Sequence, residues 1–175
     1  MKVIGIKVDN EERGEFVLES LRTAVAAERV TLDDLALVTK DEKGEVHIQQ
    51  TKDVTTGKGA RRGLLVGALV GLAAPPLLGA AAVGGGIGAL WGKFRDRGID
   101  DDLMKRVGGM IAEGQAVVFA LGDNASIDAV NDRVREVGGS DVETFTIDDN
   151  NEALVREAAD HIPEPTGPMV KAPIS

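Results

Sequence analysis

Apolar residues alternate with other residues at the start of the chain and then recur at helical spacing. Residues 3–8 (VIGIKV) alternate, which predicts a strand. Asn10 follows and can cap a helix that begins around Glu11. The apolar stripe of that helix consists of Phe16, Val17, Leu18, Leu21, Ala24, Val25 and Ala27. The first 27 residues therefore predict a strand followed by an amphipathic helix.

Two further apolar stretches flank a short polar segment. Residues 35–39 (LALVT) and 45–50 (EVHIQQ) predict a hairpin whose turn contains Gly44. The second half of the chain begins near residue 100 and continues the alternation of helices and strands. It predicts a helix capped by Asp100 or Asp101 and then a buried strand at 116–121. A helix at 125–137, capped by Asn124 or Ser126, follows. The last two predicted elements are a strand at 142–147 with one face exposed to water and a helix at 150–161.

The predicted order is β-α-β-β-α-β-α-β-α, with an apolar block between the fourth and fifth elements. Its first six elements have the β-α-β-β-α-β order of a ferredoxin-like fold. We therefore predict an α+β fold with an antiparallel ferredoxin-like sheet, helices on one face, an inserted glycine-rich helical hairpin, and an extra C-terminal α-β-α extension. The predicted regions are 1–58 (first half of the domain), 59–98 (hairpin), 99–161 (second half) and 162–175 (a disordered proline-rich tail).

The apolar block, residues 64–92, is 29 residues long and contains no charged, amide or hydroxyl side chain. One interpretation is a single transmembrane helix, because about 20 residues span a bilayer. Such a crossing would place the strands before and after it on opposite sides of the membrane. It would also place Pro75 and Pro76 in mid-span, where each removes a backbone donor. The single span is therefore disfavoured.

A helical hairpin with its turn at Pro75 and Pro76 is the favoured interpretation of the block. Its arms, 63–74 and 77–92, return both ends to the same side, so the domain can close. Basic residues at both ends suit a cytoplasmic membrane surface, and Trp91 is placed as an interfacial anchor. These flanking residues are Lys58, Arg61 and Arg62 before the block and Lys93, Arg95 and Arg97 after it.

Glycines recur every fourth residue in both predicted arms. The first arm carries Gly63, Gly67 and Gly71, and the second carries Gly84, Gly88 and Gly92. Such stripes form glycine zippers that let helix backbones approach closely. An arm of 12 residues rises only ~18 Å at 1.5 Å per residue, against ~30 Å of hydrocarbon. The hairpin is therefore expected to dip into the bilayer, or to span it only where the bilayer thins.

A third interpretation keeps the block away from lipid. The hairpin would then form the buried core of a soluble oligomer, where small apolar residues also pack well. Both this interpretation and the membrane hairpin require that the block is not left exposed on a monomer.

Composition restricts the chemistry. A net charge of −9 disfavours general nucleic-acid binding, and the absence of cysteine excludes disulfides and thiolate catalysis. The start of the chain lacks a secretory leader, which favours a cytoplasmic location. The segment TTGKGARRG (55–63) lacks the residue spacing of a phosphate-binding loop. The run Asp100–Asp102 could suggest a cation site, but capping of a helix explains it. His47 is expected on a surface strand rather than as a metal ligand. No nucleophile is paired with a base, so we expect no enzyme activity, no cofactor and no metal site.

The second half of the chain resembles a known family. The stretches GIDDDLMKRVGGMIAEGQAVVFAL (98–121) and VNDRVREVGGSDVETFTIDDNNEALVREAA (130–159), after a glycine-rich apolar block, are similar to the bacterial DUF1269 family. The resemblance covers roughly residues 2–160. Its members have no assigned function and are often labelled membrane proteins, so it implies the same fold and a membrane association but no catalytic residues.

These observations predict a non-enzymatic homo-oligomer at the bacterial inner membrane, with most of the chain cytoplasmic and lipid as a partner. Its role would be structural or stress-related, and whether the hairpins act as anchors or line a pore stays open. The alternative is a soluble homo-oligomeric binding module whose hairpins enclose an apolar core that holds a hydrophobic ligand.

Overall fold

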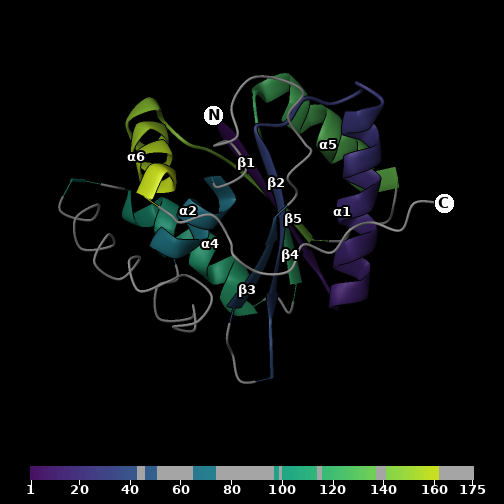
Figure 1. Cartoon of the computed structure of the whole chain (residues 1–175), viewed down its shortest axis with the longest axis horizontal. Coiled ribbons are helices and arrows are strands. Elements are labelled where there is room, and N and C mark those ends of the chain that lie inside the picture. Colours follow the sequence, from purple (N-terminus) through teal and green to yellow (C-terminus); the bar gives the residue numbers. More distant parts are fainter. Residues whose placement is uncertain are drawn as a thin grey trace.

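The computed structural model describes residues 1–42, 46–50, 65–73, 97–98, 100–113, 116–136 and 141–161. Within these ranges the chain forms an α+β domain with a five-stranded sheet and five helices (Figure 1). The elements in order are β1 (Lys2–Val8), α1 (Glu11–Ala26), β2 (Asp34–Lys40), β3 (Val46–Gln50), α2 (Leu65–Ala73), α4 (Asp101–Glu113), β4 (Ala116–Gly122), α5 (Asn124–Glu136), β5 (Asp141–Thr146) and α6 (Asp149–His161).

The sheet interleaves strands from the two halves of the sequence. Its order is β3-β2-β4-β1-β5, and every neighbouring pair is antiparallel. Strand β4 lies between β1 and β2, with Gly5 opposite Phe119 on one side and Leu37 opposite Val118 on the other. Strands from before and after the apolar block therefore belong to a single sheet.

Helices cover both faces of this sheet (Figure 1). Helices α1 and α5 pack on the face that carries Ile4, Ile6 and Val118. Helices α2, α4 and α6 pack on the opposite face, which carries Val3 and Phe119. The prediction of helices on one face only was wrong. The physical reason is that β4 is apolar at every position and buried on both sides, so it requires a layer on each face.

Strand β3 lies at the edge of the sheet. It pairs with β2, while β4 lies between β2 and β1. Exposed His47 and Gln49 alternate with inward-facing Val46 along β3. A half-polar strand suits an edge, where one side meets water, whereas the continuous apolar run of β4 suits the centre. The predicted surface position of His47 is confirmed.

Three short polar residues begin helices of the domain. The Oδ1 atom of Asn10 accepts a hydrogen bond from Arg13 N at 2.8 Å, as predicted. Asp100 accepts from Asp102 N at 2.7 Å, which confirms one of the two predicted caps of α4. The cap of α5 is Asp123, which accepts from Ser126 N at 2.8 Å, so the prediction of Asn124 or Ser126 was wrong. Within the described ranges, the bounds of the other predicted strands and helices agree with the structure within a residue or two.

Candidate functional site

The first part of the apolar block is a helix inside the domain. Every residue of α2 from Leu65 to Leu72 is buried, and Val66, Leu69 and Val70 have no exposed surface. The helix lies against α4 and α6 and against the face of the sheet formed by β2, β4 and β3. Burial of such side chains contributes roughly 1.5–3 kcal/mol each. The chain's own elements therefore cover this helix.

Asp34 provides the polar attachment of α2. This residue is the first of β2 and is 1% exposed. Its Oδ2 atom accepts a hydrogen bond from Val66 N at 2.7 Å, and its Oδ1 atom accepts one from Leu35 N at 2.8 Å. The first amides of a helix lack partners within the helix, so a carboxylate from another element can cap it. Asp34 thus caps α2 across 32 residues of sequence.

Burial raises the pKa of Asp34 from 3.8 to about 7. Hydrogen bonds from the amides of Val66, Leu35 and Leu65 oppose this rise, and the nearby charge of Asp33 adds to it. Burial prevails because the carboxylate loses water on all sides while its compensation comes from amide dipoles rather than from a cation. Asp34 therefore changes its charge near neutral pH while it holds the start of α2.

Helices α2 and α4 approach each other closely at a glycine. A Cβ atom at Gly108 of α4 would lie 3.2 Å from the carbonyl oxygen of Ala73, the last residue of α2. At the next residue, Gly109, a Cβ atom would meet nothing within 4 Å. One glycine that permits close packing of α2 is therefore on α4, in addition to the predicted stripes.

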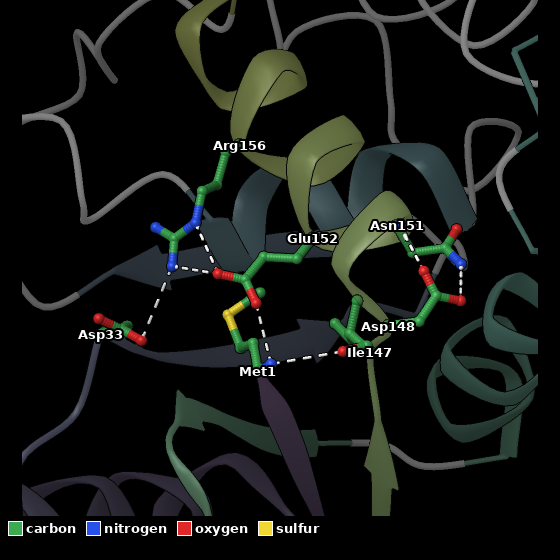
Figure 2. A network of polar contacts seen from close by, with 7 residues as sticks. All are labelled: Met1, Asp33, Ile147, Asp148, Asn151, Glu152 and Arg156. Carbon is green, nitrogen blue, oxygen red and sulfur yellow. Dashed lines mark hydrogen bonds and ion pairs between the residues drawn. The ribbon is translucent and has the colours of Figure 1, made fainter.

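The chain returns from the apolar block on the same side of the sheet. Arg97 forms an ion pair with Glu157 of α6. Three residues later, Asp100 N donates a hydrogen bond to Asn151 Oδ1 at 2.8 Å. Asn151 is 3% exposed and is held by Asp148, whose carboxylate accepts from both its backbone N and its Nδ2 at 2.8 Å (Figure 2). The starts of α4 and α6 are thereby connected, and their contacts fix where the segment after residue 96 rejoins the domain.

A second polar network links β1, α6 and the segment before β2 (Figure 2). The N-terminal ammonium of Met1 pairs with Glu152 Oε2 at 2.9 Å, and Arg156 donates to Glu152 Oε1 through Nε and Nη2. The Nη2 atom of Arg156 also lies 3.9 Å from Asp33 Oδ2. Burial would raise the pKa of Glu152, but the ammonium of Met1 and the guanidinium of Arg156 outweigh it and lower that pKa. The network thus favours an ionised Glu152 at neutral pH.

An open depression of about 540 Å³ lies beside this network. Its polar lining is acidic, and its residues are Met1, Asp33, Gly122, Asp123, Asn124, Ala125 and Glu152. Ser126 holds the Asp123 carboxylate by backbone and side-chain hydrogen bonds, which lower the pKa of Asp123. Across the residues that the structure describes, no three His, Cys, Asp or Glu side chains are placed to hold a metal ion.

The predicted site residues divide between described and undescribed parts of the chain. Gly67 and Gly71 lie in α2 and are buried within the domain, and Arg97 pairs with α6. The others, together with the hairpin turn, the Gly44 turn and the proline-rich tail, lie outside the described residues: Gly63, Gly84, Gly88, Gly92, Pro75, Pro76, Lys58, Arg61, Arg62, Lys93, Arg95 and Trp91. None of the described helices has the length and apolarity needed to cross a bilayer.

The sequence pattern did not identify Asp34 or Asn151 as important residues. Asp34 is one of two adjacent aspartates before an apolar strand, and this context is shared by many exposed turn residues. Asn151 is the middle of a polar run, DDNNE, at a helix start. Their roles arise from partners far away in sequence, Val66 and Asp100.

Comparison with known proteins gives one match. The family model described as "Protein of unknown function (DUF1269)" matches residues 60–160, which include α2, the segment to residue 97 and all elements from α4 to α6. No curated protein and no solved structure matches the chain. Because the match covers more than half of its length, the chain belongs to the DUF1269 family.

Proposed function

We propose that this protein is a non-enzymatic, membrane-associated homo-oligomer whose α/β domain lies at the cytoplasmic face of a bacterial inner membrane. In this proposal α2 stays in the domain, and residues 74–96 meet lipid and other copies of the chain. The observation that carries it is the interleaved sheet. Since β1–β3 and β4–β5 share one sheet, residues 74–96 leave and rejoin the same body.

The sequence of residues 74–96 supports contact with a bilayer surface. Residues 77–92 are apolar, and Lys93 and Arg95 follow them. A helix over 16 residues would rise ~24 Å, which is shorter than the ~30 Å hydrocarbon core. We therefore infer a segment that enters one leaflet. Basic neighbours at the headgroups would attract anionic lipid at roughly 1 kcal/mol each.

The second glycine stripe supports self-association. Gly84, Gly88 and Gly92 would bring helices of different copies close together. In contrast, Gly67 and Gly71 lie in a helix that the domain itself covers. We infer that the two stripes have different partners: the first packs inside the chain and the second between chains.

The arrangement of the sheet favours a finer fold assignment. The units β1-α1-β2 and β4-α5-β5 interleave in the order β2-β4-β1-β5, with α1 and α5 on one face. This is the strand order expected of two split β-α-β units in a ferredoxin-like fold. We infer that β3, the apolar block and α4 are an insertion between these units, and that α6 is an addition at the end.

A soluble oligomer is the second candidate, and the burial of α2 favours it. That helix needs no lipid, because protein atoms already cover it. Residues 74–96 of several copies would then cover one another and enclose an apolar ligand. The two candidates differ in whether the assembled chain binds vesicles.

Vesicle flotation tests the proposal with a matched pair of variants. The full chain would be mixed with liposomes that contain anionic lipid and centrifuged in a density gradient. Leu77→Asp/Leu78→Asp places two charges in the apolar segment, and Phe16→Asp places one on α1, where Phe16 is 54% exposed. We expect the wild type and the Phe16 variant to float with the vesicles and the double variant to stay at the bottom.

Two outcomes would overturn the proposal. A wild type that stays at the bottom with a mass several times 18.3 kDa would establish the soluble oligomer instead. Flotation lost in the Phe16 variant and kept in the double variant would place the lipid contact on α1. Far-ultraviolet circular dichroism of each variant checks that the domain is folded.

A further inference from the structure

The contact between Asp34 and α2 combines three features. A carboxylate that is 1% exposed caps the helix at its first turn. The helix it caps has no polar side chain of its own, since its sequence is LVGALVGLA. Among the described residues, no backbone hydrogen bond joins the strands to this helix. The sheet can therefore remain paired while α2 changes its position.

We propose that Asp34 is a proton-sensitive latch for α2: the neutral carboxyl keeps the helix docked in the core, and the charged carboxylate weakens that docking so that α2 leaves the core more readily. The proposal does not depend on what residues 74–96 meet. It states a conformational property of the domain, and it goes beyond the proposed membrane association.

The charge of a buried carboxylate is the physical cause. In the docked state Asp34 is 1% exposed, and burial raises its pKa to about 7 from 3.8. When α2 leaves, water reaches the carboxyl and the pKa returns toward 3.8, so the undocked state releases a proton. Between these values, each rise of one pH unit favours the undocked state by up to tenfold.

The charged groups around the latch are arranged on the neighbouring elements. Asp33 precedes it on the chain and is the charge that acts on it directly. From α6, Arg156 approaches Asp33 and binds Glu152, which pairs with the ammonium of Met1, the residue before β1. The described residues of α2 carry no titratable side chain, and neither does β4. Arg156 is therefore engaged with Asp33 and Glu152, and among the described residues no cation forms an ion pair with the Asp34 carboxylate.

Hydrogen exchange of backbone amides tests the latch in the full chain. Protection of amides in α2 would be measured between pH 5 and pH 8, corrected for intrinsic exchange, and divided by the protection of amides in β4. The wild type is compared with Asp34→Asn and Asp34→Ser, which keep a polar cap without titration. Asp33→Asn is the matched control, because it removes the adjacent carboxylate that does not cap α2.

We expect the α2-to-β4 ratio to fall roughly tenfold per pH unit up to pH 6.5 in the wild type and in Asp33→Asn, and to level off above pH 7. The ratio should be independent of pH in both Asp34 variants. A constant ratio in the wild type would overturn the proposal, as would the same pH dependence in folded Asp34 variants. If neither Asp34 variant folds, the wild-type profile decides: a fall that levels off near pH 7 supports the latch, and a flat profile refutes it. None of these outcomes depends on vesicle binding.

Discussion

The two adjacent glycines of α4 offer a direct test of how closely α2 packs in the domain. Gly108→Ala places a methyl group 3.2 Å from the carbonyl oxygen of Ala73, whereas Gly109→Ala places one in open space. Both glycines lie in the interior of the same helix, so each substitution gains the same helix propensity. The difference between the two variants therefore isolates the contact between α4 and the end of α2.

The magnitudes follow from helix propensity and from packing. Alanine stabilises a helix interior by roughly 0.8–1 kcal/mol relative to glycine, so Gly109→Ala should raise the unfolding free energy by about that amount. At Gly108 the neighbour is backbone, which moves only with the whole end of α2, so the gain should be cancelled. Gly108→Leu should destabilise by ~1–3 kcal/mol through overpacking, while Gly109→Leu should not. For a chain of this length, ~1 kcal/mol corresponds to a shift in Tm of about 2–4 °C.

Urea denaturation followed by circular dichroism would measure all four variants. The reasoning requires the Gly108 variants to be less stable than the Gly109 variants with the same side chain. Equal stabilities at the two positions would refute it, because they would mean that α2 does not lie against α4. The midpoint and the slope of each transition should both be compared, since a changed slope would indicate a different unfolded or native state.

Three further predictions concern the core and its polar contacts. The unfolding free energy of the wild type should fall by about 3 kcal/mol between pH 4 and pH 7, because the folded state retains a proton on Asp34 that the unfolded state has released. Denaturation of Asp34→Asn should show no such fall. Asn151→Ala should cost roughly 1–3 kcal/mol because Asp100 N loses its acceptor, whereas Asn150→Ala, exposed on the same helix, should be nearly neutral in the same assay. Leu69→Ala should cost ~2–5 kcal/mol of unfolding free energy, since Leu69 has no exposed surface; a loss below 1 kcal/mol would contradict its place in the core.

At acidic pH the stability of the fold should change with pH in the opposite direction, falling as the pH is lowered. The pKa of Asp123 is lowered by hydrogen bonds from Ser126, and that of Asp148 by hydrogen bonds from Asn151. Such groups stabilise the folded state above their unfolded pKa, and this contribution is lost as the pH falls through the folded pKa. Stability should therefore be greatest near pH 4–5 and decline on both sides.

Local features of the fold were predictable from the sequence because they depend on near neighbours. The strand at 3–8 and the helix capped by Asn10 were identified correctly from periodicity and capping chemistry. The order of the strands depends on contacts between distant residues, and the periodicity of the sequence did not specify it. The composition of β4 contained the missing signal, because AVVFALG has no polar side chain and belongs in the centre of a sheet with two covered faces.

In the apolar block, the periodicity of the sequence cannot distinguish a helix in a protein core from a helix in a membrane. A helix that is hydrophobic on all sides is found either in a protein core or in a membrane. The sequence LVGALVGLA fits both, and only the partners of α2 place its residues inside the domain. Those partners are α4, α6 and the sheet, which lie before and after it in sequence. The apolar surface that needs lipid or another chain to cover it is therefore smaller than the length of the block suggests.

Asp34 shows a second limit of the sequence pattern. A carboxylate at the start of a strand normally faces water, and DDLALV gives no sign that one of its two aspartates is buried. Its burial follows from the position of Val66, whose amide needs a partner at the start of α2. The first amides of a helix that starts in a core need hydrogen-bond acceptors. When an apolar helix has no capping residue of its own, an aspartate before a buried strand is therefore a candidate for that acceptor.

Fluorescence of Trp91, the single tryptophan of the chain, tests the central claim most directly. It lies in the part of the apolar block that the account assigns to the membrane. Vesicles that contain lipids brominated on their acyl chains should quench its emission, because bromine quenches only at contact distance. A Trp91→Phe/Phe16→Trp variant, which moves the tryptophan to exposed α1, should not be quenched. Emission from Trp91 that is unchanged at saturating vesicle concentration would contradict the proposed contact with lipid.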